Sequence, residues 1–116
     1  MALVRVLVAI EPNMYREVIA FHISQQRPKA NVALASRQTL QAEATRSRPH
    51  LIIASEVPTM LREQVGFFFF WVALHSDGRL DAEIKTNGCS TTIEDVSLED
   101  LVALVDKAEE ELAHAQ

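Results

Sequence analysis

Three residues that could support hydrolytic chemistry, Glu11, Ser55 and His75, each follow a short apolar segment of this 116-residue chain. A serine, a histidine and a carboxylate are the components of a nucleophilic triad. A nucleophile elbow, however, needs small residues around the serine, as in Gly-x-Ser-x-Gly, and Ser55 is followed by Glu56 and Val57. We therefore favour a polar cluster at the rim of a sheet, with a small Ser/His hydrolase as an alternative.

The other residues that could bind a metal or a phosphate lack the required spacing. No two of the four histidines lie three or four residues apart, and the single cysteine, Cys89, has no partner in a Cys-x-x-Cys motif. All three glycines follow residue 65, so no glycine-rich loop follows the earlier strands to hold a nucleotide phosphate. We expect no metal and no cofactor, and we interpret His22 as a hydrogen-bonded packing residue.

Strand-like and helix-like segments alternate over the first two thirds of the chain. The expected elements are a strand at 3–10, a helix from Asn13 to Arg27, a strand at 31–35, a helix capped by Ser36 and extending to about Ser47, a strand at 50–56, a short helix at 58–65 and a strand at 67–75. The segment at 50–56 has no charged residue before Glu56, which is typical of a parallel strand buried on both faces.

The first of these helices has one predicted apolar side. Met14, Val18 and Phe21 follow the i, i+4, i+7 spacing of a helix, with Tyr15 and Ile19 beside them. We expect this side to face the core.

The last third of the chain departs from the alternation. In the expected strand at 80–86, Leu80, Ala82 and Ile84 alternate with Asp81, Glu83 and Lys85. Asn87-Gly88 is a strong signal for a hairpin turn, and residues 89–93 return as a strand. A turn this short does not connect parallel strands, so we expect an antiparallel meander. A final helix, opened by a capping box of Ser97 and Asp100, is expected to pack on the sheet.

The order of these elements resembles the receiver domain of two-component response regulators. The likeness rests on Ile10-Glu11-Pro12 after the first strand and on the segment from Arg48 to Ser55, and it covers residues 3–76 and the last helix. It implies a single α/β domain over residues 1–116 with a flavodoxin-like three-layer sandwich. The parallel strands would have the order 2-1-3-4, continued by the antiparallel C-terminal meander.

Receiver domains hold Mg²⁺ through acids after the first strand and accept a phosphoryl group on an aspartate after the third. By this resemblance the acids are reduced to Glu11, Ser55 with Glu56 fills the acceptor position, and the family's serine or threonine falls at His75 or Ser76. Phosphoryl transfer depends on a hard cation that prefers several oxygen ligands. The resemblance therefore implies a pseudo-receiver, and these five residues form our candidate pocket.

The aromatic segment 67–75 is apolar on both faces. One interpretation is a central strand that is covered on both sides. The alternative starts from the missing crossover helix after this strand, because an uncovered apolar face would favour association with a second copy of the chain. The candidate interface consists of Phe67, Phe69 and Trp71, with Asp81, Glu83 and Lys85 at its rim.

Composition narrows the function further. The formal net charge of -5 argues against a general nucleic-acid-binding surface. The start of the chain does not resemble a signal peptide and the apolar run at 67–74 is too short to span a bilayer, so we expect a cytoplasmic protein with no membrane partner. We expect a non-enzymatic signalling domain that forms a homodimer or binds a signalling protein, and the alternative is an atypical regulator that binds phosphate or a small ligand near Ser55.

Overall fold

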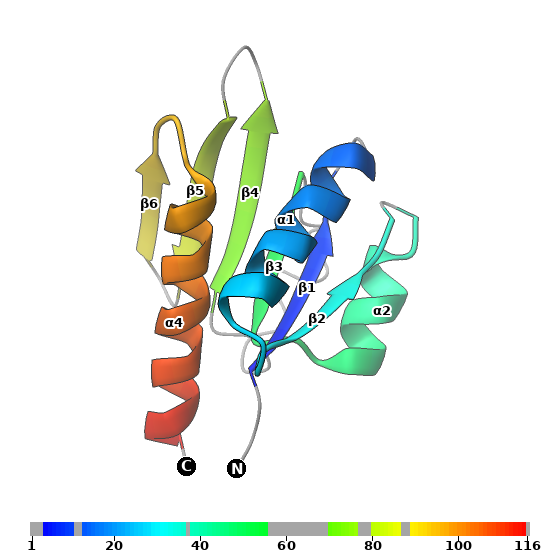
Figure 1. Ribbon diagram of the computed structural model, residues 1–116, viewed down its shortest axis with the longest axis vertical. Helices are drawn as coiled ribbons and strands as arrows, with labels where there is room; N and C mark the ends of the chain where they lie inside the picture. Colours follow the sequence, from blue (N-terminus) through cyan, green and yellow to red (C-terminus); the bar gives the residue numbers. More distant parts are fainter. Residues whose placement is uncertain are drawn as a thin grey trace.

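The computed structural model describes residues 4–10, 13–36, 38–55, 70–76, 80–86 and 89–115, which form a six-stranded sheet with the order β2-β1-β3-β4-β5-β6 (Figure 1). The strands are β1 (Arg5–Ala9), β2 (Asn31–Leu34), β3 (Leu51–Ala54), β4 (Phe70–Ser76), β5 (Leu80–Thr86) and β6 (Cys89–Ile93). The helices are α1 (Asn13–Gln26), α2 (Leu40–Ser47) and α4 (Leu98–Ala115). The predicted short helix at 58–65 lies outside the described residues.

The sheet changes from parallel to antiparallel pairing at β4. β1 pairs in parallel with β2 and β3, and β3 pairs in parallel with β4. β4, β5 and β6 then pair antiparallel. The predicted α/β fold, with parallel order 2-1-3, alternating helices and an antiparallel hairpin, is confirmed. All four residues of β3 are buried, as expected for a parallel strand with neighbours on both sides.

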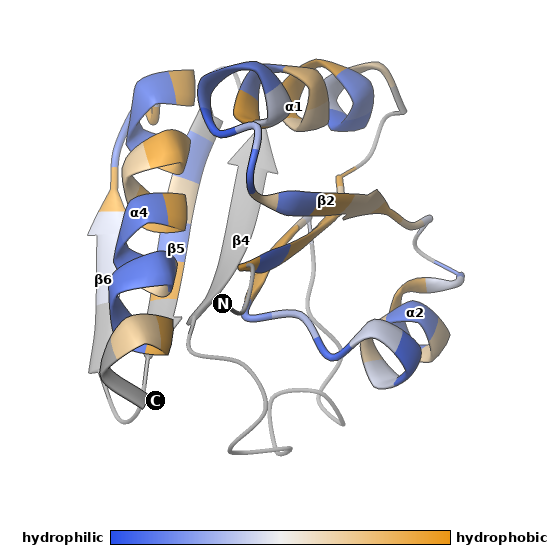
Figure 2. Cartoon of the chain, turned by 60° about the horizontal axis from the view of Figure 1, so that its bottom comes forward, coloured by the Kyte–Doolittle hydropathy of each residue, from blue (hydrophilic) through white to orange (hydrophobic). Residues whose placement is uncertain are grey.

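The helices lie on both faces of the sheet. α1 and α4 share one face, and α2 covers the other face beside β1 and β3 (Figures 1 and 2). The core under α2 is small because α2 contributes only Leu40 and Ala44 to it, against Leu7 and Ile52 of the strands. Ala42 of the same helix is exposed.

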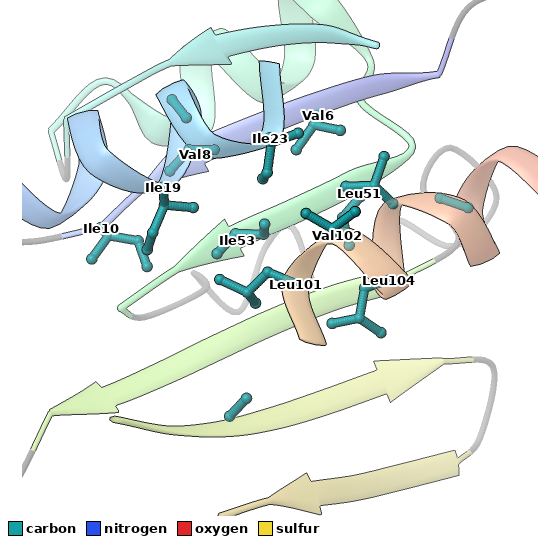
Figure 3. Close-up of a cluster of buried hydrophobic side chains, with 14 of the residues drawn as sticks. Val6, Val8, Ile10, Ile19, Ile23, Leu51, Ile53, Leu101, Val102 and Leu104 are labelled. Atoms are coloured by element: carbon teal, nitrogen blue, oxygen red, sulfur yellow. The ribbon is translucent and has the colours of Figure 1, made fainter. Parts of the chain in front are cut away.

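The larger core lies between the sheet and the α1–α4 pair. In Figure 3, apolar side chains from both helices converge on those of β1 and β3. Ile23, Ile53 and Val105 have no exposed surface, and Leu101 is 1% exposed. Burial of a Val, Leu or Ile side chain contributes about 1.5–3 kcal/mol, so this cluster is what holds α1 and α4 against the sheet.

The predicted core side of α1 is wrong at Met14, Val18 and Phe21 and right at Ile19. Met14, Val18 and Phe21 are 64%, 49% and 67% exposed, whereas Ile19 and Ile23 are 3% and 0% exposed. α1 carries two apolar arcs. The arc with Ile19 and Ile23 is surrounded by side chains of the β-strands and of α4. The periodicity of the sequence identified the helix but chose the wrong arc for its inner side.

The first residue of α2 also differs from the prediction. The N-cap residue is Thr39, and Ser36 instead closes a turn before the helix: the Thr39 N–H donates to Ser36 Oγ (3.2 Å) and the Ser36 N–H donates to Thr39 Oγ1 (2.9 Å). The predicted end at Ser47 is confirmed, with Arg48 in the left-handed region at φ 50°.

The start of α4 is as predicted. The Ser97 N–H donates to Asp100 Oδ2 (2.9 Å), and the Asp100 N–H donates to Ser97 Oγ (3.2 Å). These two bonds satisfy backbone donors that the first turn of a helix leaves without intrahelical partners. Among the described residues, no helix has the length and apolarity that crossing a membrane would require.

Candidate functional site

The carboxyl ends of β1, β3 and β4 meet at one edge of the sheet. Ala9 pairs with Ala54, and Ala54 pairs with Ala73, so the residues that follow them are level with one another. Ser55 and the last two residues of β4, His75 and Ser76, therefore lie at the same edge, where open α/β sheets bind ligands. Of the predicted pocket, Glu11 and Glu56 lie outside the described residues.

The described part of this edge offers apolar side chains where a cation would need oxygen ligands. Ala9 and Ile10 are 3% and 1% exposed, and Ile10 belongs to the core that α1 and α4 cover (Figure 3). Ser55 is half-buried and supplies a hydroxyl. Within the described ranges, no three His, Cys, Asp or Glu side chains are grouped so that they could hold a metal ion.

Arg16 brings a positive charge to the same edge, which the sequence analysis did not foresee. It lies in the first turn of α1 and its Nη1 donates to the carbonyl oxygen of Ala35, one residue beyond β2 (2.7 Å). The guanidinium therefore ties the start of α1 to the end of β2. No periodicity or motif signals this contact, because it joins two residues that are 19 positions apart in the chain.

His50 lies at the opposite edge of the sheet and has a structural role. The His50 Nδ1 accepts a hydrogen bond from the backbone N–H of Arg5 (2.9 Å), and the backbone N–H of His50 donates to the Arg5 carbonyl oxygen (2.8 Å). The side chain is 7% exposed, and this burial, together with the nearby charge of Arg5, lowers the pKa of His50 below its ordinary value of 6.5. The imidazole is thus neutral at pH 7 and accepts a backbone hydrogen bond at Nδ1.

The pairing of β4 with β5 aligns the residues of the predicted interface. Trp71 pairs with Lys85, Ala73 with Glu83, and His75 with Asp81, so these positions share one face of the sheet. The alternation predicted for β5 is confirmed over residues 81–84. Ala82 and Ile84 are buried in the core that includes α4 side chains, and Asp81 and Glu83 are half-buried. Phe67 and Phe69 lie outside the described residues.

Asp81 has a contact that the sequence did not indicate. Its Oδ1 accepts a hydrogen bond from the Asp95 N–H (2.8 Å), and Asp95 has a positive φ of 52°. A non-glycine residue in this region is uncommon and is most often Asn or Asp. Asp81 therefore fixes the connection from β6 to α4, in addition to its predicted position at the rim of an interface.

The outward side of α1 is the most apolar exposed surface among the described residues. Met14, Tyr15, Val18 and Phe21 are 64%, 41%, 49% and 67% exposed, and we call these four residues the α1 outer surface. α1 lies with α4 on one face of the sheet, at the top of the view in Figure 2. Single exposed apolar residues are common, but four on one side of one helix form a patch of the kind that marks an interaction site.

Among the described residues, two recesses flank α4. One of about 460 Å³, between α4 and the β5–β6 hairpin, is mainly apolar, with Ile84, Ile93 and Leu104 in its wall. The other, of about 290 Å³, lies between α1 and α4 beside His22 and Asp106. Within the described residues the buried Nε2 of His22 has no hydrogen-bond partner, so the predicted hydrogen bonding of this residue is not borne out at that atom.

The end of α1 is fixed to α4 beside this second recess. Arg27 Nε donates to Asp106 Oδ1 (2.6 Å) and Arg27 Nη2 donates to Asp106 Oδ2 (2.7 Å). The hydrogen bonds from Arg27 hold the pKa of Asp106 below its ordinary value, and the guanidinium charge adds to this. A two-pronged ion pair sets the orientation of both side chains, so α1 and α4 are held together by charge at one end and by their shared core along their length.

Comparisons with protein-family models, with curated proteins and with solved structures find no match for this chain.

Proposed function

We propose that this chain is a non-catalytic, pseudo-receiver-like signalling domain that functions by associating with another protein chain. The parallel strand order 2-1-3 and the helices on both faces support a receiver-like, flavodoxin-like assignment. The observation that carries the proposal is the replacement of acids by Ile10 and Ser55 after β1 and β3.

The burial of Ile10 is the reason that this edge is poorly suited to phosphoryl chemistry. Mg²⁺ prefers six oxygen ligands at close to octahedral geometry, usually with a carboxylate or two among them. Ile10 is 1% exposed and forms part of the core, so a carboxylate at this position would have to be buried among apolar side chains. The domain then keeps a receiver-like framework without the groups that phosphate would switch.

Association is supported by the α1 outer surface, where four apolar side chains of one helix are exposed together. The second surface that we propose for a homodimer or a signalling partner is the face of the β4–β5 hairpin with Trp71 and Lys85. Its described side chains, Asp81 and Glu83, are acidic and half-buried.

The test of the non-catalytic assignment is a titration of the isotope-labelled chain with Mg²⁺ and beryllofluoride, followed by amide chemical shifts. We expect no Mg²⁺-dependent change at Ile10 and Ser55. A saturable change there that needs both reagents would refute the assignment. The Ser55→Ala variant is the matched control, because any shift that persists in it does not come from the hydroxyl.

A second candidate function is the binding of phosphate or a small anionic ligand near Ser55. Arg16 supports it, because its guanidinium contacts the end of β2 at the edge that also carries Ser55. Inorganic phosphate without Mg²⁺ should then shift the Ser55 amide and should fail to do so in Arg16→Gln. A hydrolase using Ser55 and His75 would instead show esterase activity that Ser55→Ala abolishes.

A further inference from the structure

The inner side of α1 packs in the core, whereas its outer side is exposed. The inner side packs Ile19, Ala20 and Ile23 into the core, and all three are at most 9% exposed. The outer side has Met14, Val18, Phe21 and Gln25 at spacings of four, three and four residues, and all four are exposed. This is the spacing with which one helix meets another along a seam.

We infer that the α1 outer surface binds α1 of a second copy of this chain, with the two helices antiparallel about a two-fold axis. The inference rests on the proposed function, since it names the surface and the partner through which the domain associates. A two-fold contact uses the same surface on both copies, so this surface has to be complementary to itself.

The charges of α1 favour self-association on this side. The chain carries a formal net charge of -5, so two copies repel each other wherever acidic surfaces meet. α1 has two charged residues, Arg16 and Glu17, and Arg16 is bonded to the carbonyl oxygen of Ala35. Glu17 is then the one formal charge of α1 beside the seam, and the seam itself is uncharged.

The antiparallel direction follows from side-chain size and from the helix dipoles. With the axis level with the middle of the segment 18–21, Val18 lies opposite Phe21 of the second copy, which pairs a small side chain with a large one. Met14 lies opposite Gln25 of the second copy, and the flanks bring Tyr15 near His22 and Glu17 near Ser24. Antiparallel macrodipoles attract each other, whereas parallel ones repel.

The exposed apolar area is sufficient for a dimer of moderate affinity. Given the exposed fractions of Met14, Tyr15, Val18 and Phe21, and large side chains of roughly 150–250 Å² each, the four residues expose on the order of 300–550 Å² per copy. A standard interface buries about 800 Å² per partner. Glu17, His22 and Ser24 supply polar area at the rim, and Gln25 supplies it at the end of the seam. We therefore expect dimers that dissociate in the micromolar range.

The first experiment measures mass by light scattering across the micromolar range on the full chain. The wild type should change with concentration from a monomer of 13.0 kDa to a dimer. Phe21→Glu and Val18→Glu should stay monomeric with unchanged far-ultraviolet circular dichroism, because both side chains are largely exposed. The matched controls are Leu34→Glu on β2 and Glu83→Lys on the β4–β5 hairpin, and both variants should still form dimers. The wild-type Leu34 side chain is 47% exposed.

The second experiment fixes the direction by chemical cross-linking in a Cys89→Ser background. A mixture of Met14→Cys and Gln25→Cys chains should be joined by a short thiol cross-linker, whereas neither variant should be joined to itself. Efficient self-joining of Met14→Cys would mean parallel helices and would overturn the antiparallel assignment.

Two outcomes of the light-scattering experiment would overturn the inference itself. One is a wild type that is monomeric throughout the range, and the other is a dimer that survives Phe21→Glu and is lost in Glu83→Lys. The latter would move the dimer to the hairpin face and leave the proposed function in place. Failure of the proposed function has a different signature, the Mg²⁺-dependent response to beryllofluoride at Ser55.

Discussion

Truncation of Ile23 and of Phe21 in separate variants tests which side of α1 belongs to the core. Ile23 has no exposed surface and is surrounded by side chains of the main core, so Ile23→Ala removes buried carbon and leaves a cavity. Substitutions of this kind cost about 2–5 kcal/mol. Phe21 is one third buried, and burying a whole Phe side chain contributes about 1.5–3 kcal/mol, so Phe21→Ala should cost only about 0.5–1 kcal/mol.

The measurement is urea unfolding followed by far-ultraviolet circular dichroism. With a slope of about 1–3 kcal/mol per molar urea, Ile23→Ala should lower the midpoint by roughly 1–3 M and Phe21→Ala by well under 1 M. Both variants should be measured at concentrations at which the chain is monomeric, because a dimer adds a stability that depends on concentration. Equal losses in the two variants, or a larger loss in Phe21→Ala, would refute the assignment of the inner side.

Two further predictions concern single contacts. His50→Asn should make the free energy of unfolding less dependent on pH below 6.5. Because the folded pKa of His50 is lowered, the stability that His50 contributes is present above the unfolded pKa near 6.5 and is lost as the pH falls through the folded pKa. Asparagine keeps an acceptor for the Arg5 N–H but does not titrate. Thermal unfolding of both proteins between neutral and acidic pH checks this, and equal slopes would contradict it. Ser97→Ala should cost about 0.5–2 kcal/mol by removing the acceptor for the Asp100 N–H, as measured by urea unfolding, while Ser97→Asp should restore most of it.

The alternation of elements could be predicted because each boundary has a local physical cause. Proline after Arg27 and Arg48 ends helical segments, Asn87-Gly88 favours a two-residue hairpin, and Ser97 with Asp100 caps the last helix. These signals act within a few residues of chain. They gave the extents of α1, β5 and β6, and the start of α4, close to those observed.

The inner side of α1 could not be predicted because the helix has two apolar arcs. Periodicity measures the presence of an arc, and the arc with Met14, Val18 and Phe21 has larger side chains than the arc with Ile19, Ala20 and Ile23. The choice between them depends on the directions of β1 and β2 and on the place of α4. In the folded chain the smaller, β-branched and alanine side chains allow α1 to lie close to the sheet.

The candidate site shows the same division. The sequence identified Ser55 and the end of β4 as neighbours at one edge, because parallel strands of similar length end together. It missed Arg16 at the end of β2 and the bond from Asp95 to Asp81, since both contacts join residues that are 14 or more positions apart. Neither contact has a local signature in the residues around it.

By itself, the sequence determined the kinds of elements, their order, and that Ile10 and Ser55 rather than acids follow the first and third strands. Those properties depend on neighbouring residues and on side-chain chemistry, which are local. Only the tertiary structure decided that α1 turns Met14, Tyr15, Val18 and Phe21 to solvent and that Ile10 is part of the core. Burial depends on which distant segments pack together, and the free energy of that packing is a property of the whole fold.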